Sequence, residues 1–336
     1  MGTALEISVA APSREKALDA SEAAVCEIER VDALLSTWRS DTPLARLDAA
    51  PAGTPVALPG DVLGLLGTVF EWGERTEGAF EPAILPLVKV WGLRTGGHAA
   101  TDDERAQALR ATGARWFLVD LHSSTASRLH AAAGIDEGAW GKGYALDRAA
   151  EALKRAGACS AALDLGGQVL FLPSSPSDGI RVGLADPRDR ARVVGRILLR
   201  SGSLSTSGNS ERFVSAGGHR IGHLLDPRTG QPADDFGSVT VLASSGLVAD
   251  ILSTAFFVLG PEEGARLSHR LRADGVAHEV LFLIKSEGGL EARASGGFLP
   301  LIRHLDVPIV PFEEDAAPAT TARTSIQRLH PGGELP

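Results

Sequence analysis

The sequence is poor in cysteine, in aromatic residues and in basic charge. Cys26 and Cys159 are its only cysteines, and neither belongs to a Cys-x-x-Cys pair. Two cysteines are too few for a disulfide framework, so we expect both to be small buried residues. The net charge is −9, and the chain has one Tyr and five Trp in 336 residues. It therefore lacks the basic surface and the stacking aromatics of a nucleic-acid-binding protein, and we expect no nucleic-acid partner.

Long apolar runs are also missing. A membrane-spanning helix needs about 20 consecutive apolar residues. The most apolar segment, residues 246–260, is shorter and contains Asp250. No signal peptide is recognised at the start of the sequence. We therefore expect no transmembrane segment and a cytoplasmic location, or an exported or membrane-anchored protein if a signal has been removed.

The common motifs of nucleotide-binding and hydrolytic enzymes are absent too. The segment Gly141-Lys142-Gly143 lacks both the preceding glycine and the following Ser or Thr that a Walker A loop requires. The chain has no GxGxxG fingerprint around this segment, no HExxH pair, no EF-hand loop and no GxSxG turn. Its glycine clusters therefore need another explanation.

The apolar pattern predicts a mixture of helices and strands. Helices are predicted at 14–35, 59–75, 143–156, 248–259 and 261–272. The strands include 3–9, 160–172, 193–199, 238–243 and 279–284. Many strands form hairpin-like pairs and do not alternate with helices, which favours an α+β fold. We expect one domain over residues 1–311. The segment 312–336 is rich in Ala, Thr, Pro and Glu, which predicts a poorly ordered tail.

Asp250 and Thr254 lie four residues apart in an apolar predicted helix, so their side chains project from one face. A carboxylate and a hydroxyl are hard oxygen ligands that suit Mg²⁺, and Ser253 beside them offers a third oxygen. The alternative is a buried Asp250 satisfied by backbone groups, with Thr254 bonded to the preceding turn. The pattern alone leaves both interpretations open.

Three further segments carry groups that suit a phosphate ligand. In 136–143, glycines allow close backbone approach, and Lys142 can pair with a phosphate at the start of a helix. The hydroxyl run at 203–209 offers more hydrogen bonds. His223, which precedes the turn at Asp226-Pro227, can act as a general base. Taken alone, the first segment is equally well explained by a tight turn. The other two are better explained by a polar loop and a stabilised hairpin.

Together, these segments resemble the ApbE family of FAD:protein FMN transferases, both in the amino-acid sequence of each motif and in the order of the motifs along the chain. Residues 78–92, 136–147 and 162–167 are similar to the family motifs GAFDPTVGPLVNLWG, DLGGIAKGYAVD and DLGG. Residues 204–213, 223–230 and 238–260 are similar to LSTSGNYERF, HIIDPRTG and SVTVIADSCMLADALATALFVLG. The resemblance implies a single α+β unit of two intertwined T-fold-like halves. It also implies a mostly antiparallel sheet and an FAD site in the cleft between the halves.

The resemblance further implies a role for individual residues. Mg²⁺ would be held by Asp250, Thr254 and the backbone carbonyl of Ala139, with Ser253 close by. Asp136 and Lys142 would contact FAD. The FAD site would be completed by Met1, Trp38, Ala79, Phe80, Glu81 and Leu224. The implied catalytic residues are His223, which handles a proton, and the metal ligand Asp250.

The implied reaction moves FMN from FAD to a Ser or Thr hydroxyl of an acceptor flavoprotein and releases AMP. One alternative is an FAD pyrophosphatase, in which water replaces that hydroxyl. Another is a non-catalytic protein that binds or delivers FAD. Two departures from the family pattern motivate this last alternative: Glu81 replaces an Asp, and Trp140 replaces an Ile.

Overall fold

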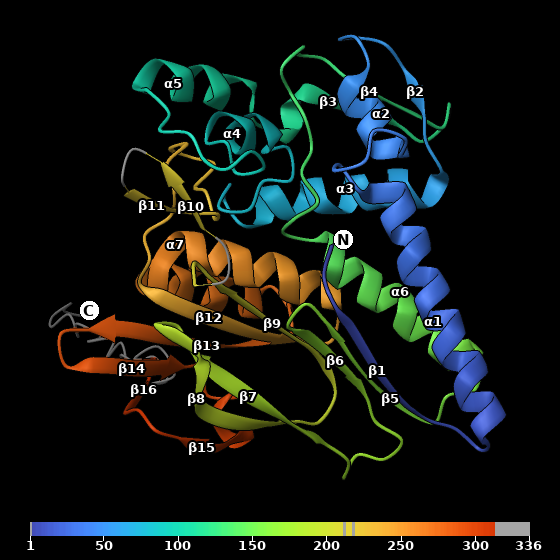
Figure 1. Cartoon of the computed structure of the whole chain (residues 1–336), viewed down its shortest axis with the longest axis vertical. Helices are drawn as coiled ribbons and strands as arrows, with labels where there is room; N and C mark the ends of the chain where they lie inside the picture. The colour runs from blue at the N-terminus through green and yellow to red at the C-terminus, as the bar shows by residue number, and fades with distance from the viewer. Residues whose placement is uncertain (1, 211–212, 217–218, 313–336) are drawn as a thin grey trace, which may run out of the picture.

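The computed structural model in Figure 1 describes residues 2–210, 213–216 and 219–312. Over these residues the α-helices are α1 (Arg14–Leu35), α2 (Pro43–Ala49), α3 (Gly60–Arg75), α4 (Leu85–Val90), α5 (Asp102–Ala111), α6 (Gly141–Arg155) and α7 (Gly246–Ala273). The first strands are β1 (Leu5–Ala10), β2 (Val56–Ala57), β3 (Phe117–Asp120), β4 (Thr125–Arg128), β5 (Ser160–Leu165), β6 (Gln168–Leu172), β7 (Ile180–Asp186) and β8 (Asp189–Leu199). They are followed by β9 (Gly202–Gly208), β10 (Phe213–Ala216), β11 (His219–Gly222), β12 (Gly237–Ala243), β13 (His278–Ser286), β14 (Gly289–Ala294), β15 (Ile302–Leu305) and β16 (Ile309–Pro311).

The largest sheet has the strand order β1-β5-β6-β9-β12-β13-β14-β16. Its neighbouring strands are antiparallel, except for the parallel edge pair β14–β16. Successive side chains of a strand point to opposite faces, so the sheet supports a core on each side. In β13, Val280 and Phe282 belong to the core on the helix side, while Leu281 and Leu283 belong to the core on the other side. The predicted α+β fold with a mostly antiparallel sheet is confirmed.

Separate layers cover the two faces of this sheet. Helices α6 and α7 pack on one face, and α1 packs on α6 (Figure 1). A smaller antiparallel sheet with the order β15-β8-β7 packs on the other face near β13 and β14. The short elements α2 to α5, together with β2 to β4, form a further group that lies above α7 in Figure 1. This group and α7 are bridged by the hairpin β10–β11.

The helix predictions agree with the structure. Helix α1 has the predicted bounds, and the Ser13 hydroxyl caps its first turn by accepting from the backbone N–H of Lys16. The two helices predicted at 248–259 and 261–272 are the two halves of α7. They are separated by Gly260, whose φ of 76° is not helical, and by Pro261, which has no N–H to donate.

Both cysteines are exposed, so the expectation that they are buried is wrong. The core face of α1 is marked by Ala20, Ala24 and Ile28, and Cys26 projects from a different side of the helix. Cys159 lies in the short connection between α6 and β5.

The first residue of the predicted tail, Phe312, packs against the core. Phe312 is buried, and its ring lies 5.9 Å from that of Phe282, between centroids. Residues 313–336 of the predicted tail lie outside the described residues. Within the described part of the chain, none of the helices combines the length and the apolar character that crossing a membrane requires.

His278 makes the stability of the fold sensitive to acid. The ring is 4% exposed, with Nδ1 2.9 Å from the carbonyl oxygen of Val276 and Nε2 2.8 Å from the Ser268 hydroxyl. A carbonyl only accepts, so Nδ1 carries the proton and Nε2 accepts from Ser268. Burial lowers the pKa of His278 to about 4, from 6.5. The neutral ring therefore contributes stability that is complete above pH 6.5 and is lost as the pH falls toward 4.

Lowering the pH from about 7.5 to about 4.5 should reduce the free energy of unfolding of both the wild type and His278→Gln. We expect the reduction to be larger in the wild type by roughly 2–3 kcal/mol, because only the wild type has a buried ring that takes up a proton when unfolding exposes it. Urea denaturation at the two pH values measures this difference. His122→Gln, which changes an exposed His in the β3–β4 turn, should retain the full wild-type pH dependence. Parallel pH dependences for wild type and His278→Gln would contradict the assignment.

Candidate active site

A cavity of about 530 Å³ lies between the N-terminal turns of α6 and α7, strand β9, the β5–β6 turn and the segments around α4. It brings together all but two of the predicted site residues, namely Trp38, Ala79, Phe80, Glu81, Asp136, Ala139, Lys142, His223, Leu224, Asp250 and Thr254. The two exceptions are Ser253, which is buried behind the wall, and Met1, which lies outside the described residues. The fold thus collects segments that are far apart in the chain.

The first turns of α6 and α7 meet at one wall of this cavity. A Cβ built on Gly143 would lie 2.1 Å from the carbonyl oxygen of Gly246, so only glycine fits at Gly143 without a shift of backbone. One turn later in α6, Asp147 accepts from the backbone N–H groups of Gly246 at 2.6 Å and Leu247 at 3.0 Å. It also accepts from the Ser245 hydroxyl at 2.6 Å. Burial raises the pKa of Asp147, and these donors oppose that shift. Asp147 therefore fixes the start of α7 against α6.

Asp250 lies on the next turn of α7 and is 3% exposed. Its Oδ2 accepts from the backbone N–H of Gly143 at 3.0 Å. Its Oδ1 lies 3.4 Å from Nζ of Lys142 and 3.5 Å from the Ser205 hydroxyl. Thr254 follows one turn later and lines the same cavity, as the spacing predicts. Backbone bonding thus accounts for one carboxylate oxygen, while the other faces a cation beside the cavity.

Ser253 ties α7 to strand β9. Its hydroxyl is fully buried and donates to the carbonyl oxygen of Asp250 at 3.0 Å. The hydroxyls of Ser205 and Ser207 lie 3.1 Å and 2.9 Å from it, within hydrogen-bonding distance. The hydroxyl run at 203–209 is therefore not the polar loop that the pattern favoured. It forms most of β9, and the serines of this strand contact α7.

Arg94 is a site residue that the sequence pattern did not single out. Its guanidinium donates to the carboxylate of Asp136 and, at 2.8 Å, to the carbonyl oxygen of Thr37. It also stacks over the indole of Trp38, 4.6 Å from the ring centroid. Glu137 accepts from the backbone N–H of Thr37 at 3.2 Å, and burial and nearby Asp136 raise the pKa of Glu137. Arg94 thus connects two of the predicted FAD contacts, Asp136 and Trp38.

The two departures from the family pattern lie in different surroundings. Trp140 is fully buried behind the wall, and its indole N–H donates to the carbonyl oxygen of Asp136 at 2.9 Å. Its bulk therefore supports the 136–143 segment from the core side and does not fill the cavity. Glu81 does line the cavity. Its carboxylate accepts from the backbone N–H of Ala83 at 2.8 Å, and burial raises the pKa of Glu81.

His223 and Leu224 also line this cavity, beside a tight turn. Asp226 organises this turn, since its carboxylate accepts from the Arg228 guanidinium at 2.9 and 2.8 Å and its carbonyl accepts from the N–H of Gly230 at 2.8 Å. The stabilised hairpin that the sequence suggests is therefore present. It holds the half-buried His223 at the cavity, so the two interpretations of this segment are compatible.

The donor chemistry of the wall fits Mg²⁺. The described residues hold no group of three or more His, Cys, Asp or Glu side chains that would bind a metal. The candidate set is one carboxylate (Asp250), one hydroxyl (Thr254) and one carbonyl (Ala139), all at the same cavity. Mg²⁺ is typically held by one or two carboxylates and completes its shell with water and substrate phosphates. A sparse all-oxygen set at one cavity matches that pattern.

The comparisons with known proteins agree with this geometry. A sequence profile of the ApbE family matches residues 1–277. The chain is 31% identical over 316 residues to the FAD:protein FMN transferase of Rhodobacter capsulatus, covering 91% of this chain and 60% of that protein. It thus spans less than two thirds of that relative. It is 30% identical over 307 residues to the FAD:protein FMN transferase of Klebsiella pneumoniae, covering 89% of this chain and 86% of that protein.

Solved structures share the fold. The crystal structure of the ApbE protein from Thermotoga maritima superposes with a TM-score of 0.77 at 27% identity, covering 90% of this chain and 99% of that one. The flavin transferase ApbE from Vibrio cholerae gives a TM-score of 0.74 at 25% identity, covering 90% and 96%.

Proposed function

The chain belongs to the ApbE family, and on this premise we propose that it is a Mg²⁺-dependent FAD:protein FMN transferase. It would move FMN from FAD to a Ser or Thr hydroxyl of an acceptor flavoprotein and release AMP. One observation carries the proposal. A single cavity gathers Asp250, Thr254, Lys142 and His223, which are a metal-binding pair, a phosphate-binding cation and a base.

The proposed reaction exchanges one phosphorus–oxygen bond for another. The acceptor hydroxyl oxygen bonds to the FMN phosphorus, and the bond from this phosphorus to the oxygen shared with AMP breaks. AMP leaves with that oxygen, and the hydroxyl proton passes to a base, so the step needs neither an oxidant nor a covalent enzyme intermediate. When bound by Asp250, Thr254 and the Ala139 carbonyl, Mg²⁺ would neutralise pyrophosphate oxygens and the charge on leaving AMP.

The protein groups around this site each have a separate task in the proposal. The start of α6 lies at the cavity, and the positive end of its helix dipole favours an anion there. The first N–H groups of α7 are already bonded to Asp147 and Ser245. Lys142 adds a mobile positive charge for a phosphate oxygen. His223 lines the same cavity and takes the hydroxyl proton. Arg94 positions Asp136 and Trp38 for the flavin nucleotide.

Chromatography of the products tests the proposal. The purified protein is incubated with FAD and Mg²⁺, with and without an acceptor protein that carries a Ser/Thr-Gly-Ala-Ser/Thr segment. Equal amounts of AMP and of acceptor with FMN attached, seen by mass, would support the transferase. AMP with only free FMN would indicate an FAD pyrophosphatase. Intact FAD that nevertheless binds would indicate a binding protein, although the position of Trp140 outside the cavity removes one of the motives for that alternative.

Replacing His223 by Gln should lower the rate of FMN transfer about 100-fold, because a general base typically contributes at least that factor. FAD affinity should change little, since an amide of similar size remains at the wall. Stopped-time assays of flavinylated acceptor measure the rate, and fluorescence titration measures FAD binding. His122→Gln, at an exposed His, is the matched control. A His223→Gln enzyme with the wild-type rate would remove His223 from the mechanism.

A further inference from the structure

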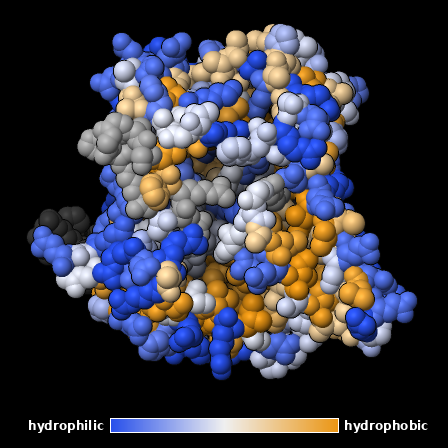
Figure 2. Space-filling view, in the orientation of Figure 1, coloured by the Kyte–Doolittle hydropathy of each residue, from blue (hydrophilic) through white to orange (hydrophobic). Residues whose placement is uncertain are grey.

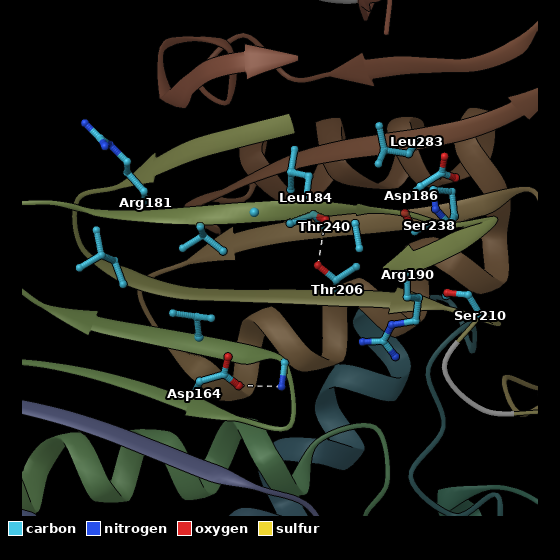
Figure 3. Close-up of a pocket in the computed structure, with 18 of the residues that line it drawn as sticks. Asp164, Arg181, Leu184, Asp186, Arg190, Thr206, Ser210, Ser238, Thr240 and Leu283 are labelled. Atoms are coloured by element: carbon cyan, nitrogen blue, oxygen red, sulfur yellow. Dashed lines mark hydrogen bonds between the residues drawn. The ribbon is translucent and has the colours of Figure 1, made fainter. Parts of the chain in front are cut away.

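A second cavity, of about 450 Å³, lies on the other face of the large sheet, between that face and strand β7 (Figure 3). Its floor is formed by outward-facing residues of neighbouring strands, which include Ser8 on β1, Asp164 on β5, Thr206 on β9 and Thr240 on β12. Figure 3 shows Thr206 and Thr240 side by side, and their hydroxyls are 2.9 Å apart. This end of the face carries hydroxyls and a carboxylate beside apolar residues such as Val169, whereas the β13–β14 end is apolar and packed against β8 and β15.

Strand β7 forms the opposite wall along its whole length. Every residue from Ile180 to Asp186 lines the cavity, including residues that point to opposite sides of the strand. The cavity therefore follows the edge of β7, where backbone N–H and C=O groups project. In the described sheet order β15-β8-β7, this strand is at the edge and pairs only with β8. An edge strand is a template for an added extended chain.

The two cavities meet at a gap in the large sheet. Strand β6 pairs with β9 only from Val169↔Leu204 to Phe171↔Gly202. Strand β9 continues to Gly208 while pairing with β12 alone. On the β6 side, the end of β9 therefore lies beside an opening. Thr206, Gly208 and Gly167 of the β5–β6 turn line both cavities.

The surface around the second cavity suits a polypeptide. On the face drawn in Figure 2, apolar surface gathers in the lower half, where Figure 1 places β7 and the β1–β6 end of the sheet, with charged residues around it. The cavity itself combines apolar side chains such as Val182 and Leu184 with hydroxyls and carboxylates. Such a mixture, next to an open strand edge, satisfies both the backbone and the alternating side chains of an extended segment.

We propose that this cavity is the groove for the acceptor protein: an extended segment of the acceptor adds to the edge of β7, and its Ser or Thr hydroxyl reaches the flavin cavity through the gap beside Thr206. This inference rests on the proposed function. The gap is bordered by two glycines, Gly167 and Gly208, and a neighbouring wall holds His223. The low bulk of these glycines suits the small residues of the Ser/Thr-Gly-Ala-Ser/Thr segment that the family resemblance implies.

Tryptophan substitutions in the groove test the proposal by direct binding. Ser8 and Ala162 are register partners on β1 and β5 and line the groove but not the flavin cavity. Ala10 is exposed two residues along β1, on the same side as Ser8 and outside the groove lining. The variants Ser8→Trp, Ala162→Trp and the control Ala10→Trp are compared. The probe is a fluorescein-labelled peptide that contains Ser-Gly-Ala-Thr, and anisotropy measures its binding to the full-length protein.

We expect saturable peptide binding by the wild type and by Ala10→Trp, and at least about tenfold weaker binding by Ser8→Trp and Ala162→Trp. FAD binding should be the same in all four proteins. Wild-type peptide affinity in both groove variants would overturn the proposal, and so would the absence of saturable binding by the wild type. If the enzyme releases only free FMN, the proposed transferase activity is wrong. The peptide titration still shows whether the groove binds an extended segment. Conversely, normal transfer with an unchanged acceptor KM in both groove variants would refute the groove alone.

Discussion

Asp250→Asn is expected to lower Mg²⁺-dependent release of AMP from FAD by at least about 1,000-fold in kcat/KM, or ~4 kcal/mol. The amide has the shape of the carboxylate and retains an oxygen that accepts from the N–H of Gly143. It lacks the negative charge, and the other oxygens of the proposed metal site, from Thr254 and Ala139, are neutral. Affinity for a hard divalent cation should therefore fall together with activity.

Calorimetric titration with Mg²⁺ and chromatography of AMP measure the two effects in the same preparation. Asp274→Asn is the matched control, because Asp274 is exposed at the C-terminal end of the same helix, α7. Asp274→Asn should keep wild-type activity, and both variants should unfold at nearly the wild-type temperature. If Asp250→Asn still turns over FAD with the wild-type Mg²⁺ dependence, the metal is bound elsewhere.

Much of the site was predictable because its key spacings are local. Asp250 and Thr254 share a wall since residues four apart share a helix face. The glycines of 136–143 indicated a close backbone approach, and Gly143 makes one with the start of α7. The resemblance to the ApbE family then predicted that these segments lie around one FAD site. The cavity lining contains all of its implied residues that the structure describes, apart from Ser253.

Other parts of the site depend on pairings that no local pattern reports. The sequence places Arg94 only in a connection after an apolar segment, where an Arg is usually solvated. Its contacts with Thr37 and Asp136 join residues 57 and 42 positions away. Similarly, the serines of β9 looked like a loop because strand β9 is rich in hydroxyls instead of apolar residues. Ser205 and Ser207 face α7, which replaces water as their partner.

The second cavity was unpredictable for a related reason. It exists because β6 stops pairing with β9 before β9 ends, and because β7 leaves one edge unpaired in the described sheets. Strand pairing is set by the whole tertiary structure, whereas the sequence pattern indicates only which segments form strands.

Gly143→Ala should damage both the fold and the site, because the added methyl group has no space. Its carbon would lie 2.1 Å from the Gly246 carbonyl oxygen and 2.8 Å from the Leu247 nitrogen, and all of these neighbours are backbone. Helices α6 and α7 must separate at their first turns. Overpacking of a core typically costs about 1–3 kcal/mol and occasionally more, and a clash with backbone, which cannot rotate away, places this site at about 3 kcal/mol or above. A displacement of about 1 Å in a catalytic site can cost a further 100-fold in rate.

We therefore expect Gly143→Ala to lower the free energy of unfolding by at least about 3 kcal/mol in urea denaturation. The folded fraction should also bind Mg²⁺ more weakly, since the N–H of Gly143 holds Asp250. Gly64→Ala is the matched control: Gly64 is an exposed helical glycine, and a Cβ added there would meet no atom within 4 Å. That change should raise stability by up to about 1 kcal/mol, because Ala restricts the unfolded chain and favours the helix. Equal stabilities for the two Ala variants would show that α6 and α7 are not in backbone contact at Gly143. A destabilised Gly143→Ala with normal Mg²⁺ affinity would instead show that the contact supports the fold alone, and that Asp250 keeps its position without the Gly143 N–H.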